Sequence, residues 1–381
     1  MTATLPTTAD VVVIGGGIIG TSIALHVARD THARVVLLEQ HHLGSGPTGR
    51  SLAVISQHYT HPALVTLARE SLQIFRSFRD RYDGDCGFVE TGLVVLVGSD
   101  RDTELRDVVA LQQDCQVEVE LLAPERLHDL DNRLFVEDVA IASYQPGAGY
   151  ASPLQTMHVL RQAATVAGVV ICEGVRATEI VTSDSAVTAV KTSAGQIVTP
   201  VVVDAAGPWG QAIARTCGIL LPLLPCRQVM AAIARFPQFG PPHIAVNDFI
   251  AGTSFRAAAE LTYVGWFDRS QVNDPIDPDN YDETIPGTSL VELAQVWQHR
   301  YPIGTATTVR VGGWSGAYDV TPDWMPICDR LGPEGFYACC GTSGHGFKFG
   351  PLFGQLVAQW IADGKRPRAE LEVLRGDRFD H

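Results

Sequence analysis

The chain has 381 residues, which is enough for one large core or, more naturally, two domains of ordinary size. Its formal charge of −14 and its scattered basic residues exclude nucleic acid and anionic lipid as partners. Eight cysteines without a CxxC pair or a regular framework indicate reduced thiols in a cytoplasmic protein, and we predict no metal site.

The N-terminal segment predicts one complete βαβ unit. Residues 10–14 are a β-branched run typical of a strand buried on both faces, and residues 34–39 are a second strand. A glycine-rich turn and a helix to about Arg29 lie between them. The apolar run in this unit is interrupted by glycines at turn spacing and is preceded by no Lys or Arg. We therefore expect neither a membrane span nor a secretion signal.

Strands and helices alternate along most of the remaining chain. Pro62 opens a helix whose leucines and phenylalanines recur at helical spacing. Further strands are predicted at 87–97, 169–171, 186–190, 201–207 and 335–340, and helices from Pro124, over 153–167 and over 351–362. Residues 221–300 differ, with eight of the 22 prolines, aromatic strands and an acidic loop at 273–283. This change of composition indicates a second domain.

The first turn carries the pattern of a dinucleotide site. Gly15 permits a tight turn, Gly17 admits a pyrophosphate close to the backbone, and Gly20 lets the helix pack on the strand. Glu39 ends the second strand, where a carboxylate accepts hydrogen bonds from a ribose and disfavours the 2′-phosphate of NADP. The glycines alone do not separate FAD from NAD. The predicted contacts here are Gly15, Gly17, Ile18, Ile19, Gly20, Glu39 and Gln40.

Four further motifs follow these glycines in a fixed order. They are Thr48–Ser51, Asp204–Trp209, Tyr318–Asp323 and Ser343–Lys348. Together the five motifs resemble the D-amino acid oxidase superfamily of flavoproteins, and within it the branch of sarcosine oxidase, dimethylglycine dehydrogenase and glycine oxidase. The resemblance covers nearly the whole chain.

The resemblance implies an α/β fold in which FAD is buried between two domains. One is a discontinuous Rossmann-like FAD-binding domain, which we assign to residues 1–85, 146–220 and 305–381. The other is an α+β substrate domain with a mixed sheet, which we assign to residues 86–145 and 221–304.

The same resemblance implies further contacts with FAD. Residues 48–51 match a stretch beside the pyrophosphate and flavin, residues 206–209 match one against the cofactor, and Val175 matches a position beside the adenine. Residues 343–347 precede a predicted helix, so their N–H groups can face the negative charge of the reduced ring. The predicted contacts are Thr48, Gly49, Arg50, Ser51, Val175, Ala206, Gly207, Trp209, Gly344, His345, Gly346, Phe347 and Lys348.

Candidate substrate residues also come from the matching positions. Lys348 matches a lysine that pairs with the substrate carboxylate, and Tyr318 matches an active-site tyrosine. Arg256, on a predicted substrate-domain strand, is placed to offer a guanidinium fork to a carboxylate. His345 is expected to orient other groups. A surface lysine, a core tyrosine and an exposed strand arginine remain the alternatives.

The chain departs from the family pattern at several positions. Residues 53–59 lack the arginines that sarcosine oxidase-like members often carry, although His58 is placed to line the pocket. Tyr263 stands where that branch keeps a lysine that assists the reaction with oxygen, so we expect oxygen to be a poor acceptor. Gly316 stands where some members tether flavin through cysteine, and no histidine stands beside Gly49. We therefore expect non-covalent FAD.

The leading hypothesis is oxidation of an amino acid or small amine to an imine by hydride transfer to flavin N5. N-methyl, imino and D-amino acids are the substrate classes that the resemblance implies. A 2-hydroxy acid dehydrogenase remains open, since His58 or His345 can serve as the base. A FAD-carrying subunit of a hetero-oligomeric dehydrogenase also remains open. The expected partners are the small substrate, an electron acceptor (oxygen or another carrier) and either a second copy or a partner subunit.

Overall fold

The predicted βαβ unit lies at the centre of a six-stranded sheet in a computed structural model, which describes residues 5–267, 273–302 and 309–379. The strand order is β18 (Ile327–Arg330), β19 (Phe336–Cys340), β12 (Val201–Asp204), β1 (Val11–Ile14), β2 (Val35–Glu39) and β8 (Val170–Glu173). All neighbours are parallel except β18 and β19. The residues of β1 are all buried, as an apolar run in a parallel sheet predicts.

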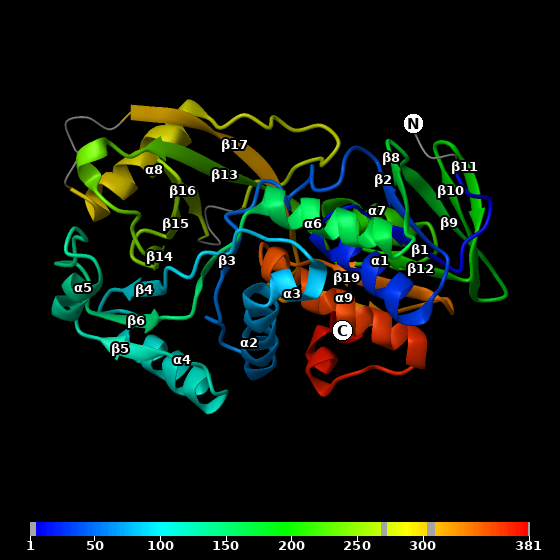
Figure 1. Cartoon of the computed structure of the whole chain (residues 1–381), viewed down its shortest axis with the longest axis horizontal. Coiled ribbons are helices and arrows are strands. Elements are labelled where there is room, and N and C mark those ends of the chain that lie inside the picture. Colours follow the sequence, from blue (N-terminus) through cyan, green and yellow to red (C-terminus); the bar gives the residue numbers. More distant parts are fainter. Residues whose placement is uncertain (1–4, 268–272, 303–308, 380–381) are drawn as a thin grey trace.

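Helices α1 (Ile18–Thr31), α6 (Pro153–Val166) and α9 (Gly346–Asp363) pack together beside this sheet (Figure 1). Glycines make the contact between α1 and α9 close. A Cβ atom on Gly350 would lie 2.8 Å from Ile18 Cγ2, and one on Gly354 would lie 2.6 Å from Ser22 Cβ. Helix α2 (Pro62–Arg76) also packs on α9 and is followed by α3 (Phe78–Tyr82). A separate three-stranded sheet contains β9 (Ala177–Ser183), β10 (Ala186–Thr192) and β11 (Gly195–Val198).

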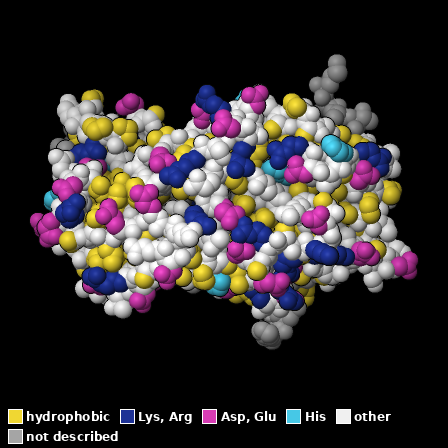
Figure 2. Space-filling view, turned by 60° about the horizontal axis from the view of Figure 1, so that its bottom comes forward, with side chains coloured by type: hydrophobic (Ala, Val, Ile, Leu, Met, Phe, Trp, Pro, Cys, Tyr) yellow, Lys and Arg dark blue, Asp and Glu magenta, His cyan; other side chains and the backbone are white. Residues whose placement is uncertain are grey.

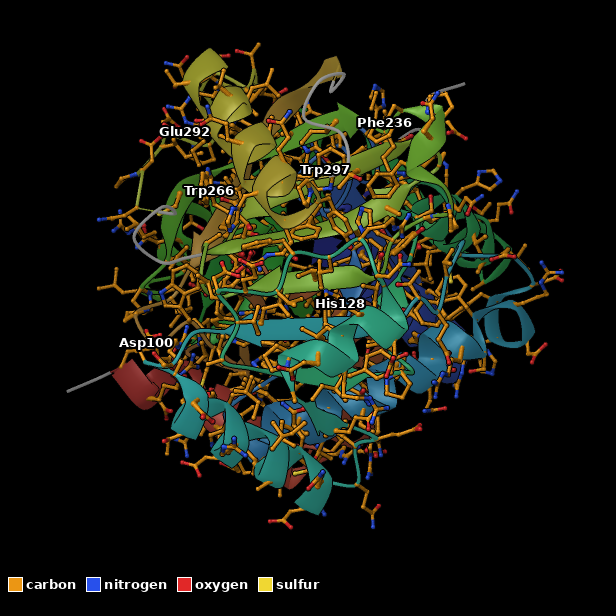
Figure 3. All side chains as sticks on the ribbon, turned by 90° about the vertical axis from the view of Figure 1, so that its left-hand side faces the viewer. Asp100, His128, Phe236, Trp266, Glu292 and Trp297 are labelled. Carbon is orange, nitrogen blue, oxygen red and sulfur yellow. The ribbon has the colours of Figure 1, made fainter. Side chains whose placement is uncertain are left out.

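An eight-stranded mixed sheet forms the opposite end of the molecule (Figure 1). Its order is β17 (Val309–Val320), β13 (Leu224–Ala234), β16 (Leu261–Trp266), β15 (Thr253–Ala258), β14 (Ala245–Asp248), β4 (Leu93–Val97), β6 (Ile141–Gln145) and β5 (Glu120–Leu122). Strands β14 and β4 pair in parallel, and the other neighbouring strands of this sheet pair antiparallel. Helix α8 (Gly287–Arg300) buries Trp297 against the sheet (Figure 3). Helices α4 (Asp102–Asp114) and α5 (Pro124–Leu130) complete this end.

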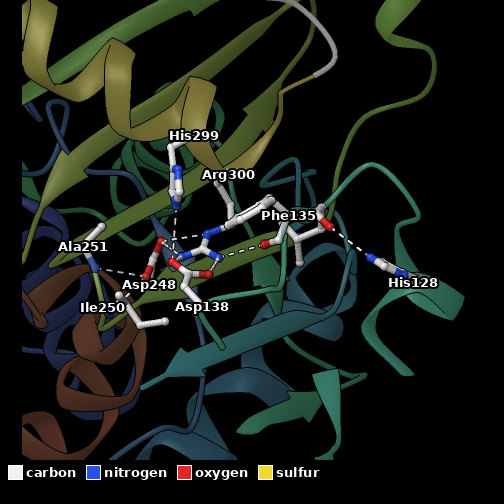
Figure 4. A network of polar contacts seen from close by, with 9 residues as sticks. His128, Phe135, Asp138, Asp248, Ile250, Ala251, His299 and Arg300 are labelled. Carbon is white, nitrogen blue, oxygen red and sulfur yellow. Dashed lines mark hydrogen bonds and ion pairs between the residues drawn. The ribbon is translucent and has the colours of Figure 1, made fainter. Parts of the chain in front are cut away.

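A buried ionic network ties α8 to the eight-stranded sheet (Figure 4). The guanidinium of Arg300 is fully buried, 2.7 Å from Asp138 and 2.8 Å from Asp248. Asp248 also accepts hydrogen bonds from the backbone N–H groups of Ile250 and Ala251. Removal of one charged partner would leave a buried charge uncompensated. The network also fixes the turn that follows β14, because Asp248 holds the N–H groups of Ile250 and Ala251.

The predicted α/β class is confirmed, and most predicted elements appear within a few residues of their expected bounds. Two differ more. The strand expected over 87–97 begins at Leu93, and α9 begins at Gly346 and contains Pro351 within it. A proline usually marks a helix start, but here the close packing of α9 on α1 outweighs the one backbone hydrogen bond that Pro351 removes.

The domain limits remain a prediction. Residues 303–308, where we place one limit, lie outside the described part of the chain. Strand β17, which follows that limit, pairs with β13 in the eight-stranded sheet.

On the face in Figure 2, Lys and Arg side chains are interspersed with Asp and Glu side chains. Among the helices that the structure describes, none has the length and apolar character needed to span a bilayer.

Candidate active site

A cavity of about 900 Å³, which we call the cofactor cavity, lies between the two large sheets. It is lined by the ends of β1 and β2 and the turn after β12 on one side, and by residues of β13 and β17 on the other. This volume is at the upper end of the roughly 300–1,000 Å³ typical of ligand pockets. The predicted FAD contacts that line it are Gly15, Gly17, Ile18, Ile19, Glu39, Gln40, Thr48, Arg50, Ser51, Val175, Ala206, Gly207, Trp209, Gly344, Gly346 and Phe347.

The glycine turn at the cavity leaves no room for side chains. Gly15 has a φ of +106°, and a Cβ atom there would lie 2.3 Å from the Ala205 carbonyl oxygen. A Cβ atom on Gly20 would lie 1.9 Å from the Gly15 oxygen, so Gly20 supports the turn without lining the cavity. Gly17, the N-cap of α1, has no side chain that could accept from the helix, although the Ile18 N–H donates to Thr48 Oγ1. A helix N-terminus that follows a glycine turn is the arrangement that binds phosphate.

Glu39 is held in place by backbone donors. Its Oε2 accepts a hydrogen bond from the Gly16 N–H at 2.8 Å and its Oε1 accepts one from the His41 N–H at 2.7 Å. Each carboxylate oxygen keeps a further lone pair that can accept a ribose hydroxyl. Val175 follows β8 rather than lying within a strand, and its N–H donates to the Glu39 carbonyl oxygen at 2.9 Å. These groups form one continuous wall of the cofactor cavity.

The loop after β2 folds back over the start of α1. Thr48 Oγ1 accepts a hydrogen bond from the Ile18 N–H at 3.1 Å. Gly49 does not line the cavity, and a Cβ atom there would lie 2.4 Å from the Gly44 oxygen, so Gly49 closes the turn. Arg50 donates to the Ser45 carbonyl oxygen at 2.6 Å. The loop therefore presents Thr48 and Arg50 to the cavity on a fixed backbone.

The acidic loop at 273–283 forms part of the wall of the cofactor cavity. Asp279 accepts a hydrogen bond from Trp209 Nε1 at 2.7 Å and pairs with Arg176 at 2.6 Å. Glu283 pairs with Arg50 at 2.6 Å. Asp279 and Glu283 both line the cavity. Sequence reasoning noted the loop only as a change in composition and missed these contacts.

The N-terminus of α9 and the side chain of Tyr318 meet at the cavity. Gly344 has a φ of +86°, and a Cβ atom there would lie 2.6 Å from Tyr318 Cζ. Because α9 begins at Gly346, the turn 343–346 leads directly into the helix N-terminus. Burial raises the pKa of Tyr318 to about 12, with an opposing contribution from Gln228, so its hydroxyl stays protonated. Gln228 also lines the cavity, and sequence reasoning missed it.

Lys348 lies in the first turn of α9 and does not line the cofactor cavity. Its Nζ donates to Ser56 Oγ at 3.0 Å and lies 5.0 Å from the centre of the Tyr59 ring. Burial lowers the pKa of Lys348 to about 7. In the described part of the chain no carboxylate pairs with this ammonium group. His345 packs its ring 5.3 Å from that of Tyr59, also outside the cavity.

Arg256 and Tyr263 lie on neighbouring strands, also outside the cofactor cavity. The guanidinium lies 4.3 Å from the ring centre of Tyr150 and 5.0 Å from that of Tyr263. It donates to the carbonyl oxygens of Leu52 and Ala257, and burial lowers its pKa to about 10. The substrate contact of Arg256 and the link of Tyr263 to oxygen reactivity stay predictions.

The cavity fits FAD, because the glycine turn at the start of α1 and the carboxylate of Glu39, held by backbone N–H groups, provide pyrophosphate and ribose sites in the expected order. The family model described as DAO, FAD dependent oxidoreductase, matches residues 10–360. Mitochondrial sarcosine dehydrogenase of Mus musculus is 28% identical to 99% of this chain, which spans 42% of that protein. Glycine oxidase of Geobacillus kaustophilus is 26% identical over 92% of both chains. The solved L-proline dehydrogenase from P. horikoshii superimposes with a TM-score of 0.89 at 27% identity over 99% of both chains.

Proposed function

This chain belongs to the DAO family of FAD-dependent oxidoreductases, and we propose that it oxidises the carbon–nitrogen bond of a carboxylated small amine. FAD, when bound, supplies the ring that accepts a hydride from the substrate carbon next to nitrogen. The substrate nitrogen loses a proton in the same oxidation, which gives an imine that water hydrolyses. N-methyl, imino and D-amino acids are the classes that we propose.

The observation that carries this proposal is Lys348. A part-buried ammonium with no carboxylate partner in the described chain is costly, because burial disfavours its charged form. A substrate carboxylate would supply the missing negative charge. The Tyr318 hydroxyl, at the cavity wall beside Gly344, is a neutral donor that can orient the bound substrate. The N-terminus of α9 offers its positive end to negative charge that develops at the cavity.

Three named relatives support the substrate class without fixing it. Sarcosine dehydrogenase, glycine oxidase and L-proline dehydrogenase are each named for a small amino acid. Their identities to this chain lie between 26% and 28%. The side-chain preference, the stereochemistry and the electron acceptor therefore require direct measurement.

Anaerobic mixing of the FAD-loaded protein with a panel of amines and 2-hydroxy acids tests the proposal. Bleaching of the flavin band by a carboxylated amine, with release of ammonia or methylamine after hydrolysis, is the expected result. Bleaching by 2-hydroxy acids alone would replace the proposal with an alcohol dehydrogenase. Full FAD occupancy without turnover with any substrate or artificial acceptor would instead indicate a FAD-carrying subunit that needs a partner.

A further inference from the structure

Two side chains of the eight-stranded sheet hold carbonyl groups in the loop that follows β2. Trp314 on β17 donates from its Nε1 to the Arg50 carbonyl oxygen at 3.0 Å. Arg256 on β15 donates from its Nε to the Leu52 carbonyl oxygen. Ser51 lies between these two carbonyl groups and, like Arg50, lines the cofactor cavity. This part of the cavity wall is therefore held by the sheet at the opposite end of the molecule.

The backbone beside these contacts adopts a strained conformation. Ala53 has a φ of +53°, in the left-handed region that alanine rarely adopts. Its N–H donates to Ser51 Oγ at 2.9 Å, and its carbonyl oxygen accepts from the Ala151 N–H at 3.0 Å. Such a conformation persists only where the surrounding contacts hold it in place. The hydrogen bond from Arg256 is one of these contacts, because it holds the peptide group that Leu52 and Ala53 share.

The charge of Arg256 is stabilised by aromatic rings. Its guanidinium is buried and lies over the rings of Tyr150 and Tyr263, each of which attracts a cation through its face. Tyr150 belongs to β7 (Gly149–Tyr150), which pairs with β3 (Val54–Ile55) directly after the loop. Tyr263 stands opposite Arg256 on β16. Burial lowers the pKa of Arg256 to about 10, so the guanidinium is still a charged donor at neutral pH.

Tyr263 contacts both of the side chains that hold the loop. Its ring meets that of Trp314 edge-on, with centroids 5.1 Å apart, and its centre lies 5.0 Å from the Arg256 guanidinium. Strand β17 approaches the loop closely at Gly316, where a Cβ atom would lie 3.3 Å from Arg50 Cβ. Arg256, Tyr263 and Trp314 therefore form one cluster, which we call the loop clamp.

We infer that the loop clamp positions residues 50–53 in the wall of the FAD site. Arg256 and Trp314 are the positioning residues, and Tyr263 aligns both of them. In this role Arg256 acts on the loop and makes no contact with the substrate, since its Nε and Nη1 already donate to two backbone carbonyl oxygens. The inference rests on the binding of FAD, which the family shares, and not on the class of substrate.

Hydrogen–deuterium exchange of the full-length, FAD-loaded protein tests the hold on the loop without any substrate. Arg256→Met removes one donor, and Trp314→Phe removes the other but keeps an aromatic ring. We expect the amide groups of residues 50–57 to exchange roughly threefold to tenfold faster in both variants. Arg235→Met is the matched control, because Arg235 is also buried and donates to backbone carbonyl oxygens where β15 turns into β16. Native exchange in both loop-clamp variants, or the same acceleration in Arg235→Met, would overturn the inference.

Release of FAD after dilution, followed by flavin fluorescence, tests the contribution of Tyr263. Tyr263→Lys places a second cation beside Arg256 and removes the ring that aligns it, so release should be roughly threefold to tenfold faster. Tyr263→Phe keeps an aromatic ring and should release FAD at the native rate. Equal release rates in these two variants would overturn the role of Tyr263.

Kinetics with substrate separate the loop clamp from a direct contact between Arg256 and the substrate. A KM for a carboxylated amine that rises about tenfold in Arg256→Met, with native exchange and native FAD release, would make Arg256 a substrate ligand and overturn the inference. Exchange and release are both measured without turnover. Failure of every amine to bleach the flavin would therefore defeat the proposed function and leave the loop clamp intact.

Discussion

Lys348 Nζ and Ser56 Oγ lie 3.0 Å apart, and this contact links the first turn of α9 to the segment that follows β3. The hydroxyl of Ser56 holds the ammonium group without neutralising it. The substrate site that we propose thus keeps a cation whose charge depends on pH and on the ligand. Two of the predictions below follow from this contact.

Lys348→Met should weaken binding of a carboxylated substrate while FAD stays bound. A charge-assisted hydrogen bond contributes about 1.5–3 kcal/mol, or roughly ten- to a hundred-and-fifty-fold in affinity. We expect KM to rise by such a factor, with kcat less affected and the flavin content normal. Lys348→Arg keeps the charge and serves as the matched variant. An unchanged KM in Lys348→Met would remove this residue from the substrate site.

The affinity for that substrate should fall as the pH rises through about 7. Burial lowers the pKa of Lys348 to about 7 in the free protein, so the ammonium is present below this pH and is lost above it. We expect KM for the carboxylated substrate to increase close to tenfold for each pH unit above about 7.5. Lys348→Met should show no such rise, because it has no group that titrates. A flat profile in the native protein between pH 6 and 9 would contradict this assignment.

The acidic loop should retain FAD in the cavity. Asp279→Asn removes the charge that pairs with Arg176, and Glu283→Gln removes the charge that pairs with Arg50. We expect faster release of FAD in both variants, measured by the rise in free flavin fluorescence after dilution. The control is Asp274→Asn in the same loop, since Asp274 pairs with Arg227 and does not line the cavity. Equal release rates in all three variants would mean that the loop does not hold FAD.

FAD should leave the protein on denaturation by acid or heat. Gly316, where some relatives tether flavin through cysteine, lines the cavity and has no reactive side chain. Cys339 and Cys340 also line it, but burial raises the pKa of both thiols well above the usual range, so they stay protonated and poorly nucleophilic. Yellow colour that remains with the precipitated polypeptide would show a covalent link.

Gly354→Ala should destabilise the fold although alanine favours helices. The added Cβ atom would lie 2.6 Å from Ser22 Cβ on α1, and overpacking of this kind costs about 1–3 kcal/mol. Gly287→Ala, at the start of α8, is the control because nothing lies within 4 Å of its Cβ position. Urea denaturation of both variants should show a lower midpoint for Gly354→Ala alone. Equal midpoints would indicate that α1 and α9 can separate slightly without cost.

The dinucleotide-binding turn is determined by residues that lie close together in the sequence, so the sequence alone predicts it. Gly15 adopts a positive φ where strand meets helix, and a Cβ atom on Gly15 or Gly20 would come within 3 Å of backbone atoms. A Cβ atom on Gly17 would lie 3.0 Å from Thr48 Oγ1. Glu39 follows at the end of the next strand, so a single βαβ unit contains the whole signal. These requirements depend on local geometry and can therefore be predicted from the order of residues.

Only the tertiary structure decided which distant groups meet. Asp279 reaches Trp209 and Arg176 across 70 and 103 residues of sequence, and the side chain of Gln112 reaches that of His58 across 54. The start of α9 was misplaced for a related reason, since its packing on α1 outweighs the usual preference of Pro351 for a helix start. Such contacts depend on how the sheets and helices pack. No short stretch of sequence contains that information, because each partner is an ordinary polar or apolar residue until the fold brings the pair together.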